Sequence, residues 1–226
     1  MAMYDHEKKA VLETSRWLSE QGYFGTHRGT GGNVSLRAGT SAMVITPSSV
    51  KYEEISVDDV FVVGLDLSVI EGNSKMKPSV ESGLHSIVYK NRPDVSAVVH
   101  THQIYSSVFA VINTPIPALF DEVSFALGPM VEIIPYALSG TPELAEHVGA
   151  KLSNQANAYI IQNHGILALG KTLPEAVFHA ELLEKAAHIY YLALSTGKTV
   201  TTLPESTIEL VAAMRGYQIK KSPEEK

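Results

Sequence analysis

The sequence predicts a single three-layer α/β domain, in which a largely antiparallel central sheet is flanked by helices. Buried-strand patterns alternate with helix patterns along the chain, and several short strands in the first half are separated only by turns, which favours antiparallel pairing. The chain has 226 residues, 45% of them hydrophobic, which is enough for one well-filled core but not for two full domains. We therefore treat residues 1–226 as one domain, with residues 218–226 as a charged tail.

The composition excludes several classes of protein. The formal net charge is −6 and no run of Lys or Arg exceeds two residues, so nucleic acid is not an expected partner. No apolar stretch reaches 18 residues, and the first nine residues lack an apolar segment, so neither a membrane span nor a signal peptide is expected. The absence of cysteine rules out disulfides and thiolate ligands and is compatible with a cytoplasmic protein. Any metal must be held by histidine and carboxylate.

The helix patterns each have a recognisable beginning or end. Gly22 and Gly197 are typical helix stops, Thr141 is a typical N-cap, and Thr172 with Glu175 has capping-box spacing. The predicted helices cover residues 5–21, 77–90, 104–112, 142–152, 173–195 and 204–215.

The strand patterns are short apolar runs bounded by turn residues. A strand follows the Gly-rich loop that ends at Asn33, and a later strand ends at Gly170. The other strand patterns cover residues 42–45, 59–70 with a turn near Gly64, 95–99, 131–134 and 158–162.

Two histidines at the end of a buried strand are the strongest chemical signal. Val95–Val99 reads as a buried strand, and His100 and His102 follow it on one face because side chains alternate along a strand. Such a pair is either a surface pair or the beginning of a metal site. A second buried-strand pattern ends at Asn163-His164-Gly165, 62 residues after His102. A third histidine in a matching context favours the metal site.

Two further features have both a structural and a chemical interpretation. The glycines of Gly31-Gly32-Asn33 make a turn or cradle an anion with their N–H groups. Ser79 is a natural N-cap, which places Glu81 in the first turn of a helix, where the helix dipole alone favours a carboxylate. His85 lies four residues later on the same helical face, and the pattern favours a core or supporting histidine over a ligand.

Five motifs in order resemble the class II aldolase/adducin-head family, which includes fuculose-phosphate aldolase and ribulose-phosphate 4-epimerase. The resemblance extends from the first helix to Tyr217. The motifs are Thr30-Gly31-Gly32-Asn33-Val34-Ser35, Ile45-Thr46-Pro47-Ser48, Pro78-Ser79-Val80-Glu81, His100-Thr101-His102 and Asn163-His164-Gly165.

The resemblance implies a role for each matching residue. His100, His102 and His164 would hold Zn²⁺, with Mn²⁺ or Co²⁺ as alternatives, and Glu81 would be the catalytic acid/base. The phosphate of a sugar phosphate would bind to residues of three motifs, namely Gly32, Asn33, Ser48, Ser49 and Ser79. Tyr217 resembles a tyrosine that assists catalysis in the fuculose-phosphate aldolases. The family also implies a homotetramer with active sites at subunit interfaces, where Asp121 and Tyr217 would reach across from neighbours.

Two positions depart from the family pattern. The aldolases commonly have two serines before the glutamate, but the second position here is Val80, which removes one hydroxyl donor. Asp121 stands where the fuculose-phosphate aldolases have a tyrosine. The epimerases use an aspartate in this region, but they usually replace the glutamate, which this chain keeps as Glu81.

The expected activity is therefore that of a metal-dependent sugar-phosphate aldolase. It would cleave a ketose phosphate to dihydroxyacetone phosphate and an aldehyde through a metal-stabilised enediolate. An epimerase, a decarboxylase or a dehydratase on the same metal scaffold remains an alternative, including one with an unphosphorylated substrate. A non-catalytic adducin-like interaction module is a second alternative, although such a module has no need for all three histidines and Glu81.

Overall fold

The computed structural model describes residues 3–26 and 30–219. Residues 220–226 of the predicted tail lie outside the described residues. The helices are α1 (Asp5–Glu20), α2 (Ser82–Asn91), α3 (Ile104–Val111), α4 (Asp121–Leu127), α5 (Pro142–Lys151), α6 (Leu173–Ser195) and α7 (Glu205–Arg215). The strands are β1 (Asn33–Ala38), β2 (Ala42–Ile45), β3 (Phe61–Gly64), β4 (Val69–Glu71), β5 (Ala97–Thr101), β6 (Ile116–Pro117), β7 (Met130–Ile134), β8 (Ala158–Ile161) and β9 (Gly165–Gly170). Two short 3₁₀ turns cover Val57–Asp59 and Leu152–Asn154.

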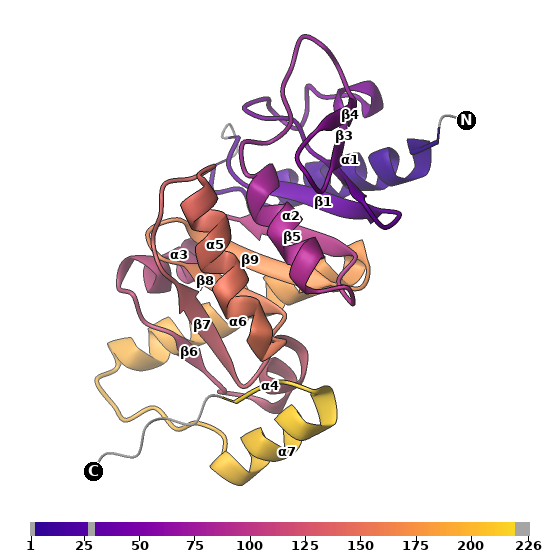
Figure 1. Cartoon of the computed structure of the whole chain (residues 1–226). Helices are drawn as coiled ribbons and strands as arrows, with labels where there is room; N and C mark the ends of the chain where they lie inside the picture. Colours follow the sequence, from indigo (N-terminus) through magenta and orange to yellow (C-terminus); the bar gives the residue numbers. More distant parts are fainter. Residues whose placement is uncertain (1–2, 27–29, 220–226) are drawn as a thin grey trace.

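One sheet runs through the described part of the molecule (Figure 1). Its nine strands lie in the order β4-β3-β2-β1-β5-β9-β8-β7-β6. The described neighbours pair antiparallel except β7 and β8, which are parallel and connected through α5. The predicted α/β class and the largely antiparallel sheet are confirmed.

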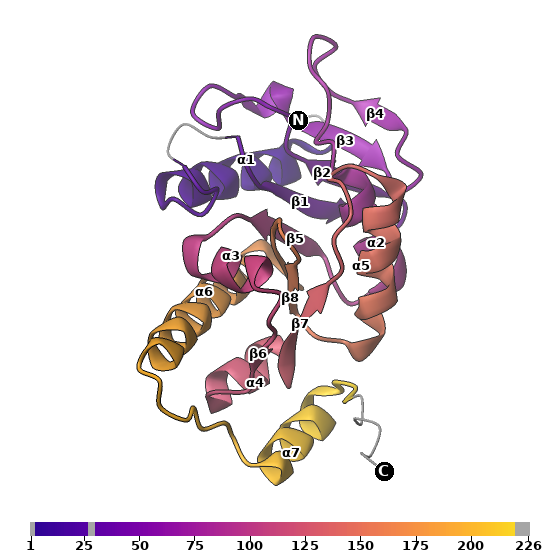
Figure 2. The same ribbon diagram turned by 90° about the vertical axis from the view of Figure 1, so that its left-hand side faces the viewer.

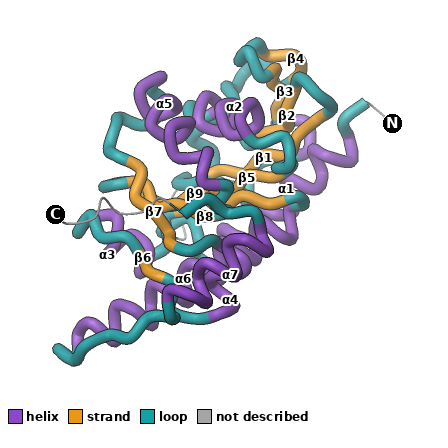
Figure 3. Tube along the Cα trace, turned by 60° about the horizontal axis from the view of Figure 1, so that its bottom comes forward, coloured by secondary structure: helices purple, strands orange, loops and turns teal. Residues whose placement is uncertain are grey.

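Helices cover both faces of the sheet, as Figures 2 and 3 show. Along β5 the side chains alternate, so that Ala97 and Val99 belong to one hydrophobic core and Val98 to the other. The first core contains residues of α1, α3 and α6, and the second contains residues of α2 and α5. A residue on the Val98 face of β5 therefore faces α2.

The structure differs from the expected elements at α2 and α4, and it shows how the strands on either side of His164 connect. The second helix begins at Ser82, not near Ser79, because residues 79–81 form a turn in which the Ser79 hydroxyl accepts from the Glu81 N–H at 3.2 Å. The strand pattern at 158–162 and the strand that ends at Gly170 form one hairpin, β8 and β9, with a turn at residues 162–164. Helix α4 was not predicted, because its seven residues are too few to show a helical repeat.

None of the helices in residues 3–26 and 30–219 has the length and apolar character that crossing a membrane requires.

Candidate metal centre and active site

The sheet directs the two strand-end histidines towards the beginning of α2. His100 and His102 continue the face of β5 that contains Val98, whereas Thr101 points the other way and bonds to Gln103 at 2.7 Å. In the register of β1 with β5, Asn33 lies opposite His100. The residues after β5 are held by the loop that follows α1, because the His102 N–H donates to the Tyr23 carbonyl at 2.9 Å.

The hairpin of β8 and β9 brings His164 to the same place. Its turn contains Asn163 at φ 54°, a left-handed conformation that Asn tolerates better than most residues. Because β9 pairs with β5 so that Ile166 lies opposite Thr101, the turn lies beside the end of β5. The pairing of β5 with β9 thus brings together His102 and His164, which are 62 positions apart in the sequence.

The three histidines form a compact cluster. Their nearest ligand nitrogens all lie within 4.8 Å of one another, and the Nε2 atoms of His100 and His102 are 3.0 Å apart. A tetrahedral zinc site with Zn–N bonds of 2.0–2.1 Å requires nitrogens about 3.3 Å apart. The cluster has the dimensions of a three-histidine site for a divalent cation.

The protonation of the cluster also fits a bound cation. His100 Nδ1 is 2.7 Å from the Ile166 carbonyl, which can only accept a hydrogen bond, so Nδ1 carries the proton and the Nε2 lone pair faces the cluster. Burial lowers the pKa of His100 and lowers that of His102 to about 3, so both rings are neutral near pH 7. A cation bound between these nitrogens satisfies lone pairs that would otherwise face one another.

Glu81 completes the cluster from the beginning of α2. Its carboxylate oxygens lie 3.2 Å from His100 Nε2 and 3.2 Å from His164 Nε2. The same carboxylate accepts from Asn33 Nδ2 at 2.7 Å and from the Ser139 hydroxyl at 2.9 Å. The side chain makes no capping bond to α2, so the helix-dipole interpretation does not explain its position.

The surroundings keep Glu81 ionised although it is 5% exposed. Burial acts to raise the pKa of its carboxyl, whereas the hydrogen bond from Asn33 and positive charge on the histidine cluster lower that pKa, and the lowering prevails. A buried, ionised carboxylate beside three histidine nitrogens can bind a metal, move a proton, or do both at different stages.

The predicted anion-binding residues come from three segments that lie side by side. The Thr46 backbone N–H donates to Val34, next to Asn33. The Ser48 N–H donates to Lys77 at 2.9 Å, and the Ser79 N–H donates to Thr46 at 3.0 Å. The backbone alone requires glycine at position 32, because φ of Gly32 is +71° and a Cβ there would lie 2.6 Å from the His100 carbonyl oxygen.

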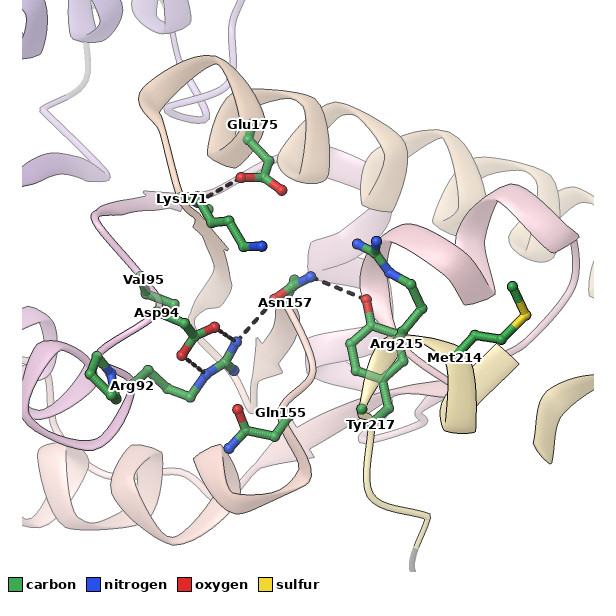
Figure 4. Close-up of a pocket in the computed structure, with 13 residues that line it drawn as sticks. Arg92, Asp94, Val95, Gln155, Asn157, Lys171, Glu175, Met214, Arg215 and Tyr217 are labelled. Carbon is green, nitrogen blue, oxygen red and sulfur yellow. Dashed lines mark hydrogen bonds and ion pairs between the residues drawn. The ribbon is translucent and has the colours of Figure 1, made fainter. Parts of the chain in front are cut away.

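The structure does not bring Tyr217 to the histidine cluster of its own chain. The Tyr217 hydroxyl donates to the Phe125 carbonyl at 2.9 Å and accepts from Asn157 at 3.1 Å. Tyr217 instead lines a separate cavity of about 610 Å³, which Arg92 and Lys171 also line (Figure 4). Asp121 is exposed as the first residue of α4, where a carboxylate favours the helix N-terminus.

Sequence reasoning missed Ser139 as a partner of Glu81. It lies in the loop between β7 and α5, where nothing in the local pattern indicates contact with a helix start more than fifty residues earlier. Its hydrogen bond depends on the pairing of β7 with β8, which brings this loop to the α2 side of the sheet.

Gly165→Ala is expected to weaken metal binding without a change in any ligand. The added Cβ would meet the Thr101 carbonyl oxygen and lie 2.6 Å from His102 Cδ2, so the backbone or the ligand ring must move. Overpacking of this kind typically costs about 1–3 kcal/mol. Metal content and Tm are the measurements.

Gly83→Ala is the matched control, because its Cβ meets only Leu67 Cδ1 at 4.0 Å and Ala favours a helix. Equal metal affinity in the two variants would show that the Gly165 hairpin does not set the ligand positions.

Comparison with known proteins agrees with this geometry. The sequence profile of the family described as Class II Aldolase and Adducin N-terminal domain matches residues 9–191. An L-fuculose phosphate aldolase of Escherichia coli O6:H1 is 35% identical over 191 residues, covering 83% of this chain and 85% of the relative. A 5-deoxy-D-ribulose 1-phosphate aldolase of Bacillus thuringiensis serovar kurstaki is 37% identical over 195 residues, covering 85% of this chain and 89% of the relative.

A solved structure described as L-fuculose 1-phosphate aldolase superposes with a TM-score of 0.84 at 33% identity, covering 93% of this chain and 96% of that one. The fold, the order of the motifs and the relatives agree, and the chain belongs to the class II aldolase and adducin N-terminal domain family.

Proposed function

We propose that this chain is a divalent-metal-dependent aldolase that cleaves a ketose 1-phosphate into dihydroxyacetone phosphate and an aldehyde. The observation that carries the proposal is the position of the buried Glu81 carboxylate, 3.2 Å from two of three clustered histidines. The relatives named as fuculose phosphate and deoxyribulose 1-phosphate aldolases favour this activity over epimerisation, decarboxylation or dehydration. The combination of His100, His102, His164 and Glu81 argues against a purely structural module.

His100, His102 and His164 would hold the cation, and we propose Zn²⁺, with Mn²⁺ or Co²⁺ as alternatives. When bound, the cation would polarise the substrate carbonyl and stabilise the negative charge of the enediolate that C–C cleavage produces. His100 keeps its Nε2 lone pair on the cluster because Nδ1 donates to Ile166.

Glu81 would be the group that exchanges a proton with the substrate carbon. In cleavage, the bond between C3 and C4 of the ketose breaks, the electron pair stays with the C3 fragment, and the C4 hydroxyl passes its proton to a second group, for which Asp121 and Tyr217 are the candidates. In the condensation direction the ionised Glu81 would remove a proton from C3 and become protonated, and in cleavage the protonated Glu81 would deliver that proton to C3 and become ionised again. The hydrogen bonds from Asn33 and Ser139 orient the carboxylate for this transfer.

The substrate phosphate would bind where the three neighbouring segments meet. We assign this site to Gly32, Asn33, Ser48, Ser49 and Ser79. The three serines offer hydroxyl donors, and the segment of Ser79 leads directly into the N-terminus of α2. Val80, the departure from the family pattern, is 64% exposed, and a Cβ added at Gly140 would lie 3.3 Å from the Val80 Cβ. An exposed apolar side chain in this segment supplies no donor.

Val80→Ser is expected to lower KM for the phosphorylated ketose with little change in kcat. A hydrogen bond to a charged group contributes about 1.5–3 kcal/mol, or about ten- to a hundredfold in affinity. The new hydroxyl acts at the phosphate and not at the breaking bond. Steady-state kinetics with the phosphorylated ketose and its unphosphorylated analogue are the test, and an unchanged preference for phosphate would contradict the assignment of the pocket.

We further propose a cytoplasmic homotetramer in which neighbouring subunits complete the active site. Asp121 is exposed on α4 and is available to a neighbour, where it would take the second proton transfer. Tyr217 would take the same role only if it gives up its bonds to Phe125 and Asn157. Sedimentation velocity tests the tetramer, and the loss of kcat in Asp121→Asn and Tyr217→Phe compares the two residues.

A panel of substrates tests the activity itself. The enzyme is supplied with ketose 1-phosphates, including fuculose and 5-deoxyribulose 1-phosphate, with ketose 5-phosphates and with unphosphorylated keto acids. Release of dihydroxyacetone phosphate from a 1-phosphate, dependent on divalent metal, is the expected result. Turnover confined to 5-phosphates or keto acids would favour an epimerase or a decarboxylase.

A further inference from the structure

A line of buried polar side chains connects Glu81 to the interior of the protein. Asn33 and Ser35 lie two residues apart on the face of β1 that meets α2, and Glu81, His85 and Tyr89 follow at four-residue intervals along α2. Two residues of a strand span about 6.7 Å and four residues of a helix about 6 Å, so the row of side chains on β1 and the row along α2 have nearly equal spacing. All five side chains are at most 5% exposed.

Hydrogen bonds cross between the two rows at every step. Asn33 Nδ2 donates to Glu81 at 2.7 Å, and Asn33 Oδ1 is 2.5 Å from His85 Nε2. His85 Nδ1 is 2.6 Å from Ser35 Oγ, which is 2.7 Å from the Tyr89 hydroxyl. The chain of bonds runs Glu81, Asn33, His85, Ser35, Tyr89.

The chemistry of the groups gives this chain one direction. Asn33 presents its NH₂ to the Glu81 carboxylate and its carbonyl oxygen to His85, so that each end of the amide meets a partner. His85 must then donate from Nε2, and because burial lowers its pKa to about 3, the neutral ring accepts at Nδ1 from Ser35. Tyr89, whose pKa burial raises, donates to Ser35. Every proton in the chain points towards Glu81.

We propose that His85 is a positioning residue for the reaction, which fixes the Asn33 amide so that its NH₂ group faces Glu81. Without a donor on the other side, the Asn33 amide is free to turn its carbonyl towards the Glu81 carboxylate, where two acceptors oppose one another. His85 thus acts on Glu81 through Asn33 and does not touch substrate or metal. The inference rests on the proposed acid/base role of Glu81.

The test is a cycle of four enzymes measured on the active ketose 1-phosphate, namely the wild type, His85→Leu, Asn33→Ala and the double variant. His85→Leu is expected to lower kcat by about ten- to a hundredfold, the size of one hydrogen bond to a charged group, with KM and metal content unchanged. Because His85 acts through Asn33, the double variant should be no slower than Asn33→Ala alone. His85→Gln, which keeps a donor towards Asn33, should recover most of the rate.

His179→Leu is the matched control, since His179 is also buried, at 2% exposed, and bonds to the Leu169 carbonyl on the other side of the sheet. Three results would overturn the inference. The first is a loss of kcat in His85→Leu no larger than in His179→Leu, and the second is a loss in the double variant equal to the product of the two single losses. The third is a rise in KM with no loss of kcat. If His85→Leu does not fold, Ser35→Ala replaces it in the same cycle, because it removes the donor that holds the His85 tautomer. Full turnover in Glu81→Gln would instead remove the proposed role of Glu81 itself.

Discussion

Glu81→Gln lowers kcat by about 10²–10⁴-fold in this account, while the metal content and KM stay near wild-type values. Gln keeps the length and most of the shape of the side chain, and its amide oxygen can still accept from Asn33 or Ser139. It cannot exchange a proton with a substrate carbon. A loss confined to kcat is the signature of an interaction made only in the transition state.

Glu132→Gln is the control for this experiment, since Glu132 is a partly buried carboxylate on β7 that pairs with Lys151 at 2.6 Å, outside the cluster. Its kcat is expected to match the wild type. A Glu81→Gln enzyme with wild-type kcat would leave Glu81 as a residue that only supports the cluster.

His164→Ala gives the second large effect, a loss of bound metal together with turnover. Three histidine nitrogens face the site, so removal of the His164 ring leaves only two histidine ligands beside Glu81. Loss of a mere supporting partner of a ligand already lowers metal affinity by about 10–100-fold, so loss of a ligand should exceed this range. The His164 side chain is 13% exposed and lies in the turn between β8 and β9, so the fold should persist.

Metal per chain, measured by plasma mass spectrometry after dialysis, is the readout, and circular dichroism checks the fold. His6→Ala, at an exposed position of α1, should retain the wild-type metal content. Full occupancy in a folded His164→Ala variant would mean that the third histidine is not a ligand.

The sequence predicts the parts of the site that depend on local periodicity. Alternation along a strand puts His100 and His102 on one face, and helical spacing puts Glu81 and His85 on one face. The convergence of His164 with the pair was predicted only from matching contexts, because the β5–β9 pairing that causes it joins segments far apart in the chain. The family resemblance, which the profile match and the relatives confirm, placed His164 with the pair, whereas local periodicity could not do so.

Other features depend on contacts that no local pattern contains. The late beginning of α2 follows from hydrogen bonds of the Ser79 segment to Thr46 and Glu81, which compete with a helical turn. Ser139 reaches Glu81 only after β7 and β8 pair. The direction of the Asn33 amide is set by His85 from across the sheet-helix interface, where neither residue alone indicates the bond.

The central claim is that Glu81 and a histidine-bound metal together interconvert dihydroxyacetone phosphate and its enediolate. Exchange of one proton of dihydroxyacetone phosphate with solvent is the most direct measurement of this claim. The enzyme is incubated with dihydroxyacetone phosphate alone in D₂O and followed by proton NMR, so the identity of the aldehyde does not matter. We expect stereospecific exchange of one of the two hydrogens on the hydroxymethyl carbon. Chelation should abolish this exchange, divalent metal should restore it, and the Glu81→Gln enzyme should not show it. Metal-loaded enzyme that binds dihydroxyacetone phosphate without exchanging this hydrogen would contradict it.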